Sequence, residues 1–557
     1  MRYCCFFLLV LSCIGCTTAT SYDTIIRNGL VYDGNGGNPI KADIAINADT
    51  IAFIGDLGNA VAKQEIDVNG MAVAPGFINM LSWATVTLLQ DGNSQSDIRQ
   101  GVTTEIMGEG ESCGPLNERM KANWQKSQGD FKFEISWNTL GEYLQHIEKK
   151  GISCNVASFV GATTVRNYVL GEDNIAPTPA QLDSMQALVK QAMEEGALGV
   201  GSSLIYPPAF FAKTDELTAL CKTAAPYGGM YISHMRSEGN NLLEALEELI
   251  TISKDAGIPA EVYHLKAAGQ NNWAKLDSAI RRIERARAEG MAITANMYNY
   301  EAGATSLTAS FPPTLQDGGF GKLHEKLKQP AVRAALKKEM QTNATNWENL
   351  YYAAGSPKNI LLIEFSNDSL RKYNGMSLAS IATQRGQSPE ECAMDLVIED
   401  SSNIGAVYFL MQEDNIKKQI ALPWMSFCSD AGSYTNEGNF LRSSVHPRAY
   451  GNFARLLGKY VRDEKIIPLQ EAIRKLTKLP ATNLKLQKRG ELKVGNYADI
   501  VVFDAARITD VATFGNPHQY AKGMLHVWVN GQQVLNAGAH TNAKPGKFLK
   551  GPGYKKS

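Results

Sequence analysis

The sequence predicts an α/β protein with a (β/α)8 TIM-like barrel, a small β-sandwich domain built from both termini, and an inserted lid-like subdomain. Three observations predict this fold. His234 and His264 each end a short apolar run, and the two runs lie one strand–helix–strand unit apart. Six further runs of β-forming residues bring the strand count of the middle of the chain to eight. Turn-rich, alternating sequence at both ends is typical of antiparallel strands.

The first residues predict export. Residues 1–20 contain Arg2 followed by CCFFLLVLSCIGC, an apolar run that is too short to span a bilayer and is typical of a secretory signal peptide. VLSC ending at Cys13 and CIGC ending at Cys16 both resemble the bacterial lipoprotein box. Either cysteine predicts a lipid anchor in the cell envelope, and plain secretion is the alternative. The later cysteines show no CxxC spacing, so neither a disulfide framework nor a zinc knuckle is indicated.

Both ends of the mature chain predict β structure. Residues 21–70 read as short alternating strands broken by NG and DGNGG turns. Residues 485–557 contain a second set, GELKVGNYADIVVFDA and MLHVWVNGQQVLNAG. We therefore expect one β-sandwich assembled from both segments.

Residues 71–484 are predicted to form the barrel. Its expected strands are Met71–Asn79, Thr103–Met107, Asn155–Val160, Gly199–Leu204, Gly229–Ser233, Ile258–Tyr263, Ala292–Tyr298 and Met425–Asp430. An insertion at about residues 303–424 holds helical sequence at Gly321–Met340 and Leu378–Asp400 and an apolar run at Ile360–Phe365. Plain loops of that length are uncommon, so we expect a subdomain over the barrel mouth.

The two histidines predict a metal site. Between them, leucines and isoleucines recur at helical spacing, with Asn240 expected as the N-cap and Gly257 as the stop. If both strands are parallel, both imidazoles emerge at the carboxyl end of the barrel, where such folds build active sites. A single strand-end histidine is more often a hydrogen-bonding cap. A matched pair, with Lys266 two residues after the second, favours metal binding.

The ordered set of motifs resembles one family. AVAPGFIN, GVTTEIMG, SSLIYPP, SHMRSEG, VYHLKAAG, MYNYEAG, CSDAG, HPRAYGNF and GNYADIVVFD follow each other as in the amidohydrolase superfamily, and are most similar to the N-acyl-D-amino-acid deacylases (D-aminoacylases). The resemblance covers nearly all of the mature chain. It implies a metal-dependent hydrolase that cleaves the amide bond of N-acyl-D-amino acids or similar N-acylated carboxylates.

The resemblance also implies residue roles. In that family a cysteine after the second strand and histidines matching His234 and His264 hold a metal ion, and an aspartate matching Asp430 shuttles the proton. Arg448 and Lys266 would pair with the substrate carboxylate. Tyr298 would donate a hydrogen bond to that carboxylate or to the acyl oxygen, and His446 is expected to shape its loop.

Several family ligands are missing from this chain. Leu81 and Trp83 stand where the first strand usually carries His-x-His, Gly110 stands at the cysteine position, and Gly161-Ala162 follows the third strand where a histidine is common. The usual binuclear centre is therefore excluded. Leu81 and Trp83 are expected to fill the second metal pocket as a dry apolar wall.

The lost cysteine leaves the third ligand open. We expect Glu109, one residue before Gly110, to replace it, with its oxygens within about 3–5 Å of both imidazoles. Glu111 and Cys113 are the alternatives. The prediction is one divalent ion, expected to be zinc, bound by Glu109, His234 and His264.

Two functions remain open. The first is the metal-dependent amidohydrolase, and the second is a lipid-anchored binding protein that kept the fold but lost its metal site. The net charge of −1 and the pI near 6.7 give no electrostatic reason to bind nucleic acid or an acidic membrane. We expect a small-molecule substrate with a carboxylate, and membrane contact only through the lipid anchor.

Overall fold

The computed structural model describes residues 21–555. The predicted signal peptide, with Cys13 and Cys16, lies outside these residues. Across the described part of the chain, no helix has both the length and the apolar character that a membrane span requires.

Eight parallel strands close into a barrel. They are β6 (Phe77–Asn79), β7 (Val102–Met107), β8 (Asn155–Ser158) with its continuation β9 (Val160–Gly161), β10 (Gly199–Ser203), β11 (Met230–His234), β12 (Ala260–Val262), β13 (Ile293–Met297) and β18 (Met425–Phe427). The strands pair in this order as two arcs, β6-β7-β8 and β9-β10-β11-β12-β13-β18. Backbone bonds from Met80 to Phe427 (3.2 Å) and from Leu198 to Ser158 (2.9 Å) join the arcs. The predicted barrel is confirmed.

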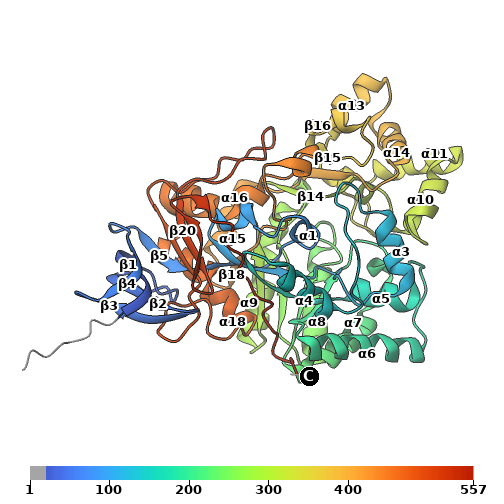
Figure 1. Cartoon of the computed structure of the whole chain (residues 1–557). Helices are drawn as coiled ribbons and strands as arrows, with labels where there is room; N and C mark the ends of the chain where they lie inside the picture. The colour runs from blue at the N-terminus through green and yellow to red at the C-terminus, as the bar shows by residue number, and fades with distance from the viewer. Residues whose placement is uncertain (1–20, 556–557) are drawn as a thin grey trace, which may run out of the picture.

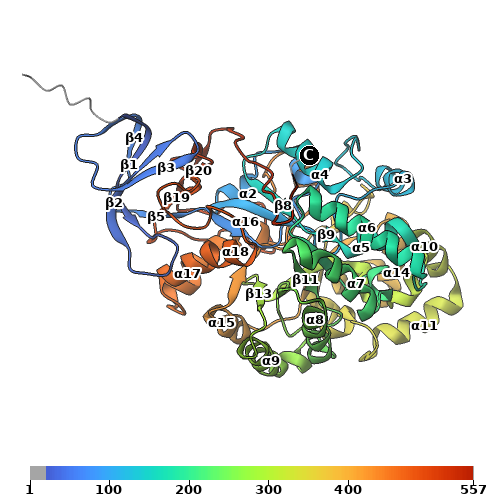
Figure 2. The same cartoon turned by 90° about the horizontal axis from the view of Figure 1, so that it is seen from below.

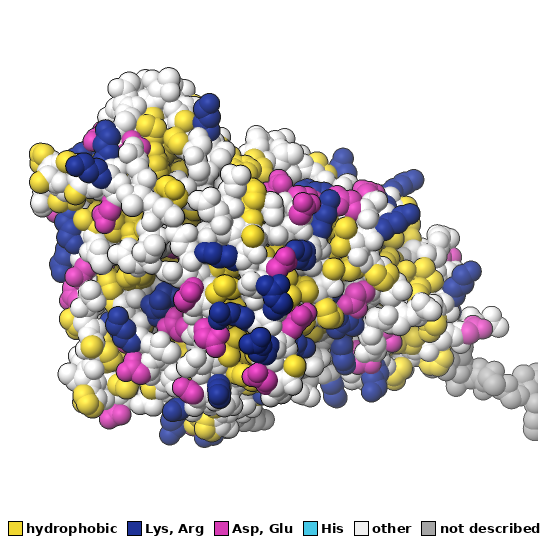
Figure 3. Space-filling model, turned by 180° about the vertical axis from the view of Figure 1, so that it is seen from behind, with side chains coloured by type: hydrophobic (Ala, Val, Ile, Leu, Met, Phe, Trp, Pro, Cys, Tyr) yellow, Lys and Arg dark blue, Asp and Glu magenta, His cyan; other side chains and the backbone are white. Residues whose placement is uncertain are grey.

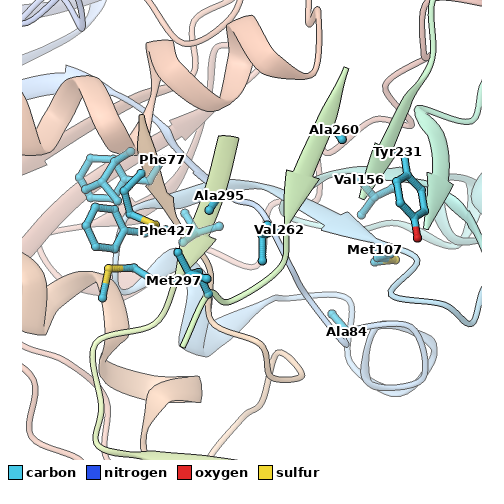
Figure 4. Packing of buried hydrophobic residues seen from close by; sticks show 14 of the residues in the cluster. Phe77, Ala84, Met107, Val156, Tyr231, Ala260, Val262, Ala295, Met297 and Phe427 are labelled. Carbon is cyan, nitrogen blue, oxygen red and sulfur yellow. The ribbon is translucent and has the colours of Figure 1, made fainter. Parts of the chain in front are cut away.

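The strands divide their side chains between two buried clusters. Ile106 and Ile232 belong to the cluster inside the barrel, whereas Met107 and Val262 belong to the cluster between the strands and the surrounding helices. Figure 4 shows Val262, Ala295 and Met297 among the buried side chains of the second cluster. Both faces of each strand are covered, which explains why the strands read as continuous apolar runs in the sequence.

Helices cover the outside of the barrel, as Figure 2 shows. They are α1 (Thr87–Gln90), α2 (Gln95–Ile98), α3 (Glu118–Lys126), α4 (Leu140–Lys150), α5 (Ala162–Leu170), α6 (Pro179–Glu195), α7 (Thr214–Ala224), α8 (Leu242–Ala256), α9 (Leu276–Ala288), α15 (Glu413–Ala421), α16 (Arg448–Arg455), α17 (Leu469–Leu476) and α18 (Lys478–Asn483). Helix α8 ends at Gly257, with φ 63°, as predicted. Its N-cap is Asn241, so the expected cap at Asn240 is wrong. The Asn240 amide instead donates to Asn343 and Ala344 of the insertion, both at 2.6 Å.

One sheet is built from both ends of the chain. Its strands are β1 (Ser21–Val31), β2 (Ile40–Asn47), β3 (Thr50–Gly55), β4 (Val61–Asp67), β5 (Ala72–Pro75), β19 (Ile500–Phe503), β20 (Met524–Val529), β21 (Gln532–Asn536) and β22 (Ala539–His540). Strand β5 joins the two halves, parallel to β1 and antiparallel to β19. In Figure 1 the blue N-terminal strands lie beside the red β20. The predicted first barrel strand is therefore two strands, β5 in this sheet and β6 in the barrel.

Gly76 separates β5 from β6. A Cβ atom at this position would lie 2.1 Å from Oγ1 of Thr103 on the neighbouring barrel strand. The close approach lets the chain pass from the terminal sheet into the barrel without a loop.

The insertion forms its own small sheet and core. Strands β14 (Ala302–Ser306), β17 (Gly405–Phe409), β15 (Ile360–Glu364) and β16 (Met376–Ser377) pair in that order. Helices α10 (Phe320–Leu327), α11 (Pro330–Met340), α12 (Leu350–Ala353), α13 (Leu378–Arg385) and α14 (Pro389–Asp400) pack with them around a separate apolar cluster. In Figure 1 this subdomain lies at the opposite end of the molecule from the terminal β strands. The expected helical segments form helices, and the apolar run at Ile360–Phe365 contains strand β15.

The segment that follows β22 runs against the barrel. The amide of Val156 on β8 donates to the carbonyl of Lys547 (2.9 Å), and the amide of Leu549 donates back to Val156 (2.8 Å). The amide of Gly546 donates to Ile152 (2.8 Å). Phe548 thus forms an isolated parallel bridge with Val156 of β8.

The surface carries mixed charge. Figure 3 shows one face of the molecule, where Lys and Arg side chains are interspersed with Asp and Glu side chains. This distribution fits the net charge of −1.

A buried acid inside the barrel gives the first testable prediction. Burial, and then the neighbouring Asp97, raise the pKa of Glu105 on β7 to about 8. The folded chain therefore keeps a proton that the unfolded chain has already lost above about pH 5. This stabilisation is complete below about pH 4.5 and disappears as the pH rises toward 8.

We expect Glu105→Gln to remove this pH-dependent loss of stability. The glutamine amide has nearly the same shape as the protonated carboxyl group and does not ionise. Between about pH 5.5 and pH 8 the free energy of unfolding should fall on the order of 2 kcal/mol less in the variant than in the parent. Chemical denaturation at both pH values measures this, with the exposed Glu289→Gln as control. An equal fall in variant and parent would contradict the assignment.

Candidate metal centre and active site

Three buried donors converge at the carboxyl end of the barrel. Glu109 follows β7, His234 ends β11, and His264 follows β12. Glu109 Oε1 lies 3.1 Å from Nδ1 of His234 and 2.7 Å from Nε2 of His264. One ligand atom from each of the three lies within 4.8 Å of the others. The structure thus brings together the residues predicted as ligands, at the distances expected.

The donor set fits a divalent ion. One carboxylate and two imidazoles are typical ligands of a catalytic zinc site with one open position. Donors that share an ion at about 2 Å each lie about 3 Å apart, close to the separations found here. Burial opposes the negative charge of Glu109, but His264 and His234 outweigh it and hold the pKa of that carboxyl well below its usual range. Glu109 is therefore ionised and able to act as a ligand.

The two alternative ligands stay outside this cluster. Glu111 is exposed, and Cys113 is buried next to Tyr143. Gly110, at the position of the family cysteine, has φ +70° and a Cβ there would lie 2.5 Å from Cβ and 2.7 Å from the amide nitrogen of Ser203. No cysteine fits at that position without moving the backbone of β10. Instead, the preceding residue, Glu109, places its carboxylate beside the two histidines.

Glu238 was not predicted from the sequence, yet it holds the site together. Its Oε1 lies 3.0 Å from Nδ1 of His264 and accepts a hydrogen bond from Nζ of Lys266 at 2.6 Å. A carboxylate on the outer nitrogen of a metal-binding histidine orients the ring and raises its basicity. The only signal in the sequence was an acid four residues after His234, which is also common in exposed loops.

Lys266 lies between Glu238 and the imidazole. Its Nζ is 2.7 Å from Nδ1 of His264, and burial is outweighed by Glu238, so the pKa of Lys266 is raised. The ammonium lines the cavity, but its nearest partner is Glu238 rather than open solvent.

The expected apolar wall at Leu81 and Trp83 is wrong. Leu81 is fully buried in the cluster inside the barrel and does not line the cavity. Trp83 does line it, and is 37% exposed. Its indole Nε1 donates to Oε2 of Glu109 (2.9 Å) and approaches Oδ1 of Asp430 at 3.2 Å. The indole of Trp83 therefore places a polar N–H group between the two carboxylates, where an apolar surface was expected.

The buried Arg448 and the partly buried Asp430 form an ion pair beside the donors. Nη2 of Arg448 lies 2.9 Å from Oδ2 of Asp430, and the guanidinium lies 4.3 Å from the centre of the Tyr298 ring. Nε and Nη1 of Arg448 have no hydrogen-bond partner among the described residues. His446 bonds the carbonyl of Ala302 (2.9 Å) and accepts from the amide of Arg448 (3.0 Å), so it shapes the loop as expected.

Two of these residues have strained backbones. His264 has φ 34° and Asp430 has φ 48°, in the left-handed region that non-glycine residues rarely adopt. Strain of this kind persists where the surrounding structure holds a functional side chain in place. Burial raises the pKa of Asp430 while Arg448 opposes the rise.

A cavity of about 430 Å³ opens onto these groups. Its walls come from the barrel and from the insertion, including Phe311, Trp347 and Leu350. Such a volume suits a small ligand.

Comparison with known proteins places this site in a family. Residues 441–535 match the model described as "Amidohydrolase family". The chain is 31% identical over 532 residues to D-aminoacylase of Alcaligenes xylosoxydans xylosoxydans, covering 95% of this chain and 97% of that protein. The chain belongs to the D-aminoacylase family of amidohydrolases. The resemblance inferred from the motifs is confirmed.

Solved structures of D-aminoacylase-family members share this fold. N-acyl-D-glutamate deacylase of Bordetella bronchiseptica, complexed with zinc and a phosphonate mimic of the tetrahedral intermediate, matches with a TM-score of 0.78 at 27% identity, covering 95% of this chain and 100% of that one. A D-aminoacylase structure concerned with one-metal activation and second-metal attenuation of a binuclear centre matches with a TM-score of 0.77 at 30% identity and the same coverage. The chain described here therefore has the amidohydrolase barrel fold.

Proposed function

We propose that this chain is a metal-dependent amidohydrolase that removes the acyl group from N-acyl-D-amino acids or similar N-acylated carboxylates. The observation that carries the proposal is the convergence of Glu109, His234 and His264 next to the Asp430–Arg448 pair. The named relatives, a D-aminoacylase and an N-acyl-D-glutamate deacylase, support the substrate class. The alternative, a binding protein that has lost its metal site, is less well supported, because three donors converge at that position.

We propose one divalent ion per chain, held by Glu109, His234 and His264. Zinc is the proposed ion because the donor set suits it and because the Bordetella relative contains it. Such an ion, when bound, supplies a Lewis acid for the amide carbonyl and makes water nucleophilic near neutral pH. Trp83 donates to the two carboxylates where a second ion would need ligands, which supports a single ion.

The other residues have separate roles in this proposal. Asp430 accepts the proton of the attacking water and returns it to the leaving amine. Arg448 lines the cavity and pairs with the substrate carboxylate, and the Tyr298 hydroxyl donates a hydrogen bond beside it. Glu238 accepts the Nδ1–H of His264 and keeps that ring oriented, and Lys266 donates to Glu238 and holds it in place.

Metal content and hydrolysis together test the proposal. Elemental analysis of the purified mature chain should find one divalent ion per chain, and a panel of N-acetyl-D-amino acids should be hydrolysed. The matching L-enantiomers are the control. A metal-loaded protein that cleaves no member of the panel would overturn the proposed function.

Arg448→Lys should raise KM for carboxylate substrates by at least about tenfold, because an ammonium cannot replace the planar fork of donors. Lysine is a better probe than alanine here. Arg448 is only 2% exposed, so alanine would leave both a cavity and an unpaired Asp430. Steady-state kinetics measure the effect, and thermal melting checks the fold. Unchanged KM on every substrate that the parent hydrolyses would contradict this role.

We also propose that the chain is exported and lipidated on Cys13 or Cys16. The support is the apolar segment of residues 1–20 and its two lipoprotein-box patterns. Mass spectrometry of the native N-terminus distinguishes a diacylglyceryl cysteine from an unmodified start after residue 16, which would indicate plain secretion.

A further inference from the structure

Negative charge dominates the substrate cavity. Lys266 and Arg448 are the only Lys or Arg side chains that line it in the described part of the chain. Each is already paired with an acid: Lys266 with Glu238 at 2.6 Å and Arg448 with Asp430 at 2.9 Å. If Arg448 takes the α-carboxylate of the substrate, the one basic lining side chain that remains among the described residues is Lys266, whose ammonium is held by Glu238.

Three further carboxylates line the same cavity. Glu111, Glu348 and Glu364 form no ion pair within 4.0 Å of any described Lys, Arg or His. Glu348 is buried and accepts a hydrogen bond from Ser237 at 2.6 Å. Burial raises the pKa of Glu348 to about 7, so part of its charge is lost near neutral pH. Glu111 and Glu364 are exposed at the cavity rim and are the stronger sources of field.

The two rim acids come from different parts of the fold. Glu111 follows Glu109 in the loop after β7, and Glu364 ends β15 of the insertion. Glu111 lies near Glu172, whereas Glu364 lies near Asp130, Asp400 and Arg371. Asp130 is paired with Arg371 at 2.8 Å and with Arg442 at 3.3 Å. Glu111 and Glu364 are therefore the exposed cavity carboxylates without an ion-pair partner among the described residues, and the walls below them include apolar side chains.

We infer that Glu111 and Glu364 determine side-chain specificity, so that the substrate is an N-acyl-D-amino acid with a neutral or basic side chain, not D-glutamate or D-aspartate. This inference rests on the proposed amidohydrolase function. A second carboxylate on the substrate would find no free basic side chain in the cavity and would be repelled by the two rim carboxylates. At an intermediate dielectric, each repulsive interaction weakens substrate binding by about tenfold. Neutral and basic side chains avoid that cost.

Two substrates of matched shape isolate the charge. N-acetyl-D-glutamine and N-acetyl-D-glutamate differ by one amide, so the ratio of their kcat/KM values reports the penalty for the second carboxylate. We expect the glutamine compound to be preferred by at least tenfold, and N-acetyl-D-lysine to be accepted. Raising the salt concentration should reduce the preference, because the rim acids are exposed.

Variants assign the penalty to the rim. The double variant Glu111→Gln/Glu364→Gln should lower the glutamine-to-glutamate ratio at least fivefold, whereas the exposed Glu289→Gln, outside the cavity, should leave it unchanged. Thermal melting confirms that each variant folds.

The outcomes separate this inference from the function on which it rests. Hydrolysis of N-acetyl-D-glutamine or N-acetyl-D-leucine with equal or better hydrolysis of N-acetyl-D-glutamate would overturn the specificity inference and leave the function intact. A preference that the double variant does not alter would remove Glu111 and Glu364 as its cause. Failure to hydrolyse any of these compounds with metal bound would refute the proposed function itself.

Discussion

Asp430→Asn should lower kcat by about 10³-fold or more while the protein keeps its metal ion. Asp430 is not one of the three converging donors; it pairs with Arg448 and faces the indole of Trp83. An asparagine keeps the size and can still accept one hydrogen bond from Arg448. It cannot take a proton from the attacking water, and that loss removes general base catalysis.

Kinetics and elemental analysis on the same preparation distinguish the possible roles of Asp430. The expected result is one ion per chain with turnover close to background. Loss of the ion together with the activity would make Asp430 a ligand. Substantial residual turnover would mean that another group accepts the proton. Glu109 would be the first candidate, because the Trp83 indole N–H contacts both Glu109 and Asp430.

Glu109→Ala should abolish both metal binding and activity. The carboxylate is the only anionic member of the three-donor set, and two neutral imidazoles alone make a weak site. We expect the affinity for zinc to fall by at least about 100-fold, measured by competition with a chromophoric chelator. Glu111→Ala, two residues away and outside the donor cluster, is the matched control and should bind zinc as the parent does. Tight zinc binding by Glu109→Ala would refute the assignment.

The family cysteine should not rescue that variant. In Glu109→Ala/Gly110→Cys the new Cβ would meet Ser203 at 2.5 Å. We expect lower thermal stability and no recovery of metal binding. Recovery of zinc binding would mean that the loop after β7 can move far enough for a cysteine at position 110 to act as a ligand.

The metal donors could be predicted because strand register fixes them. Parallel strands end at the same edge of a barrel, so two histidines at the ends of neighbouring strands must approach each other. Glu109 followed from a similar argument, since it lies two residues after β7 and its side chain is long enough to reach the position of a neighbouring cysteine. Where the backbone is regular, sequence spacing translates directly into distance.

Glu238 and the indole orientation of Trp83 could not be predicted in this way. Both lie in loops beyond the strands, where side-chain direction depends on local turns and not on a fixed period. The same limit applies to Asn240, which was expected to cap α8 but whose amide donates hydrogen bonds to the insertion. The division of the first predicted strand at Gly76 was hidden because apolar residues continue through both halves.

The sheet shared by the two ends constrains how the chain can fold during synthesis. Strand β5 acquires its neighbour β19 only after the ribosome has made the whole barrel between them, and residues 546–549 join β8 later still. Contacts between residues so far apart in the sequence form slowly, because the entropy cost of closing a long loop must be met before the contacts stabilise the fold. Until then β5 is paired only with β1 and β8 only with β7 and its barrel neighbours, so the nascent chain exposes open strand edges for most of its elongation.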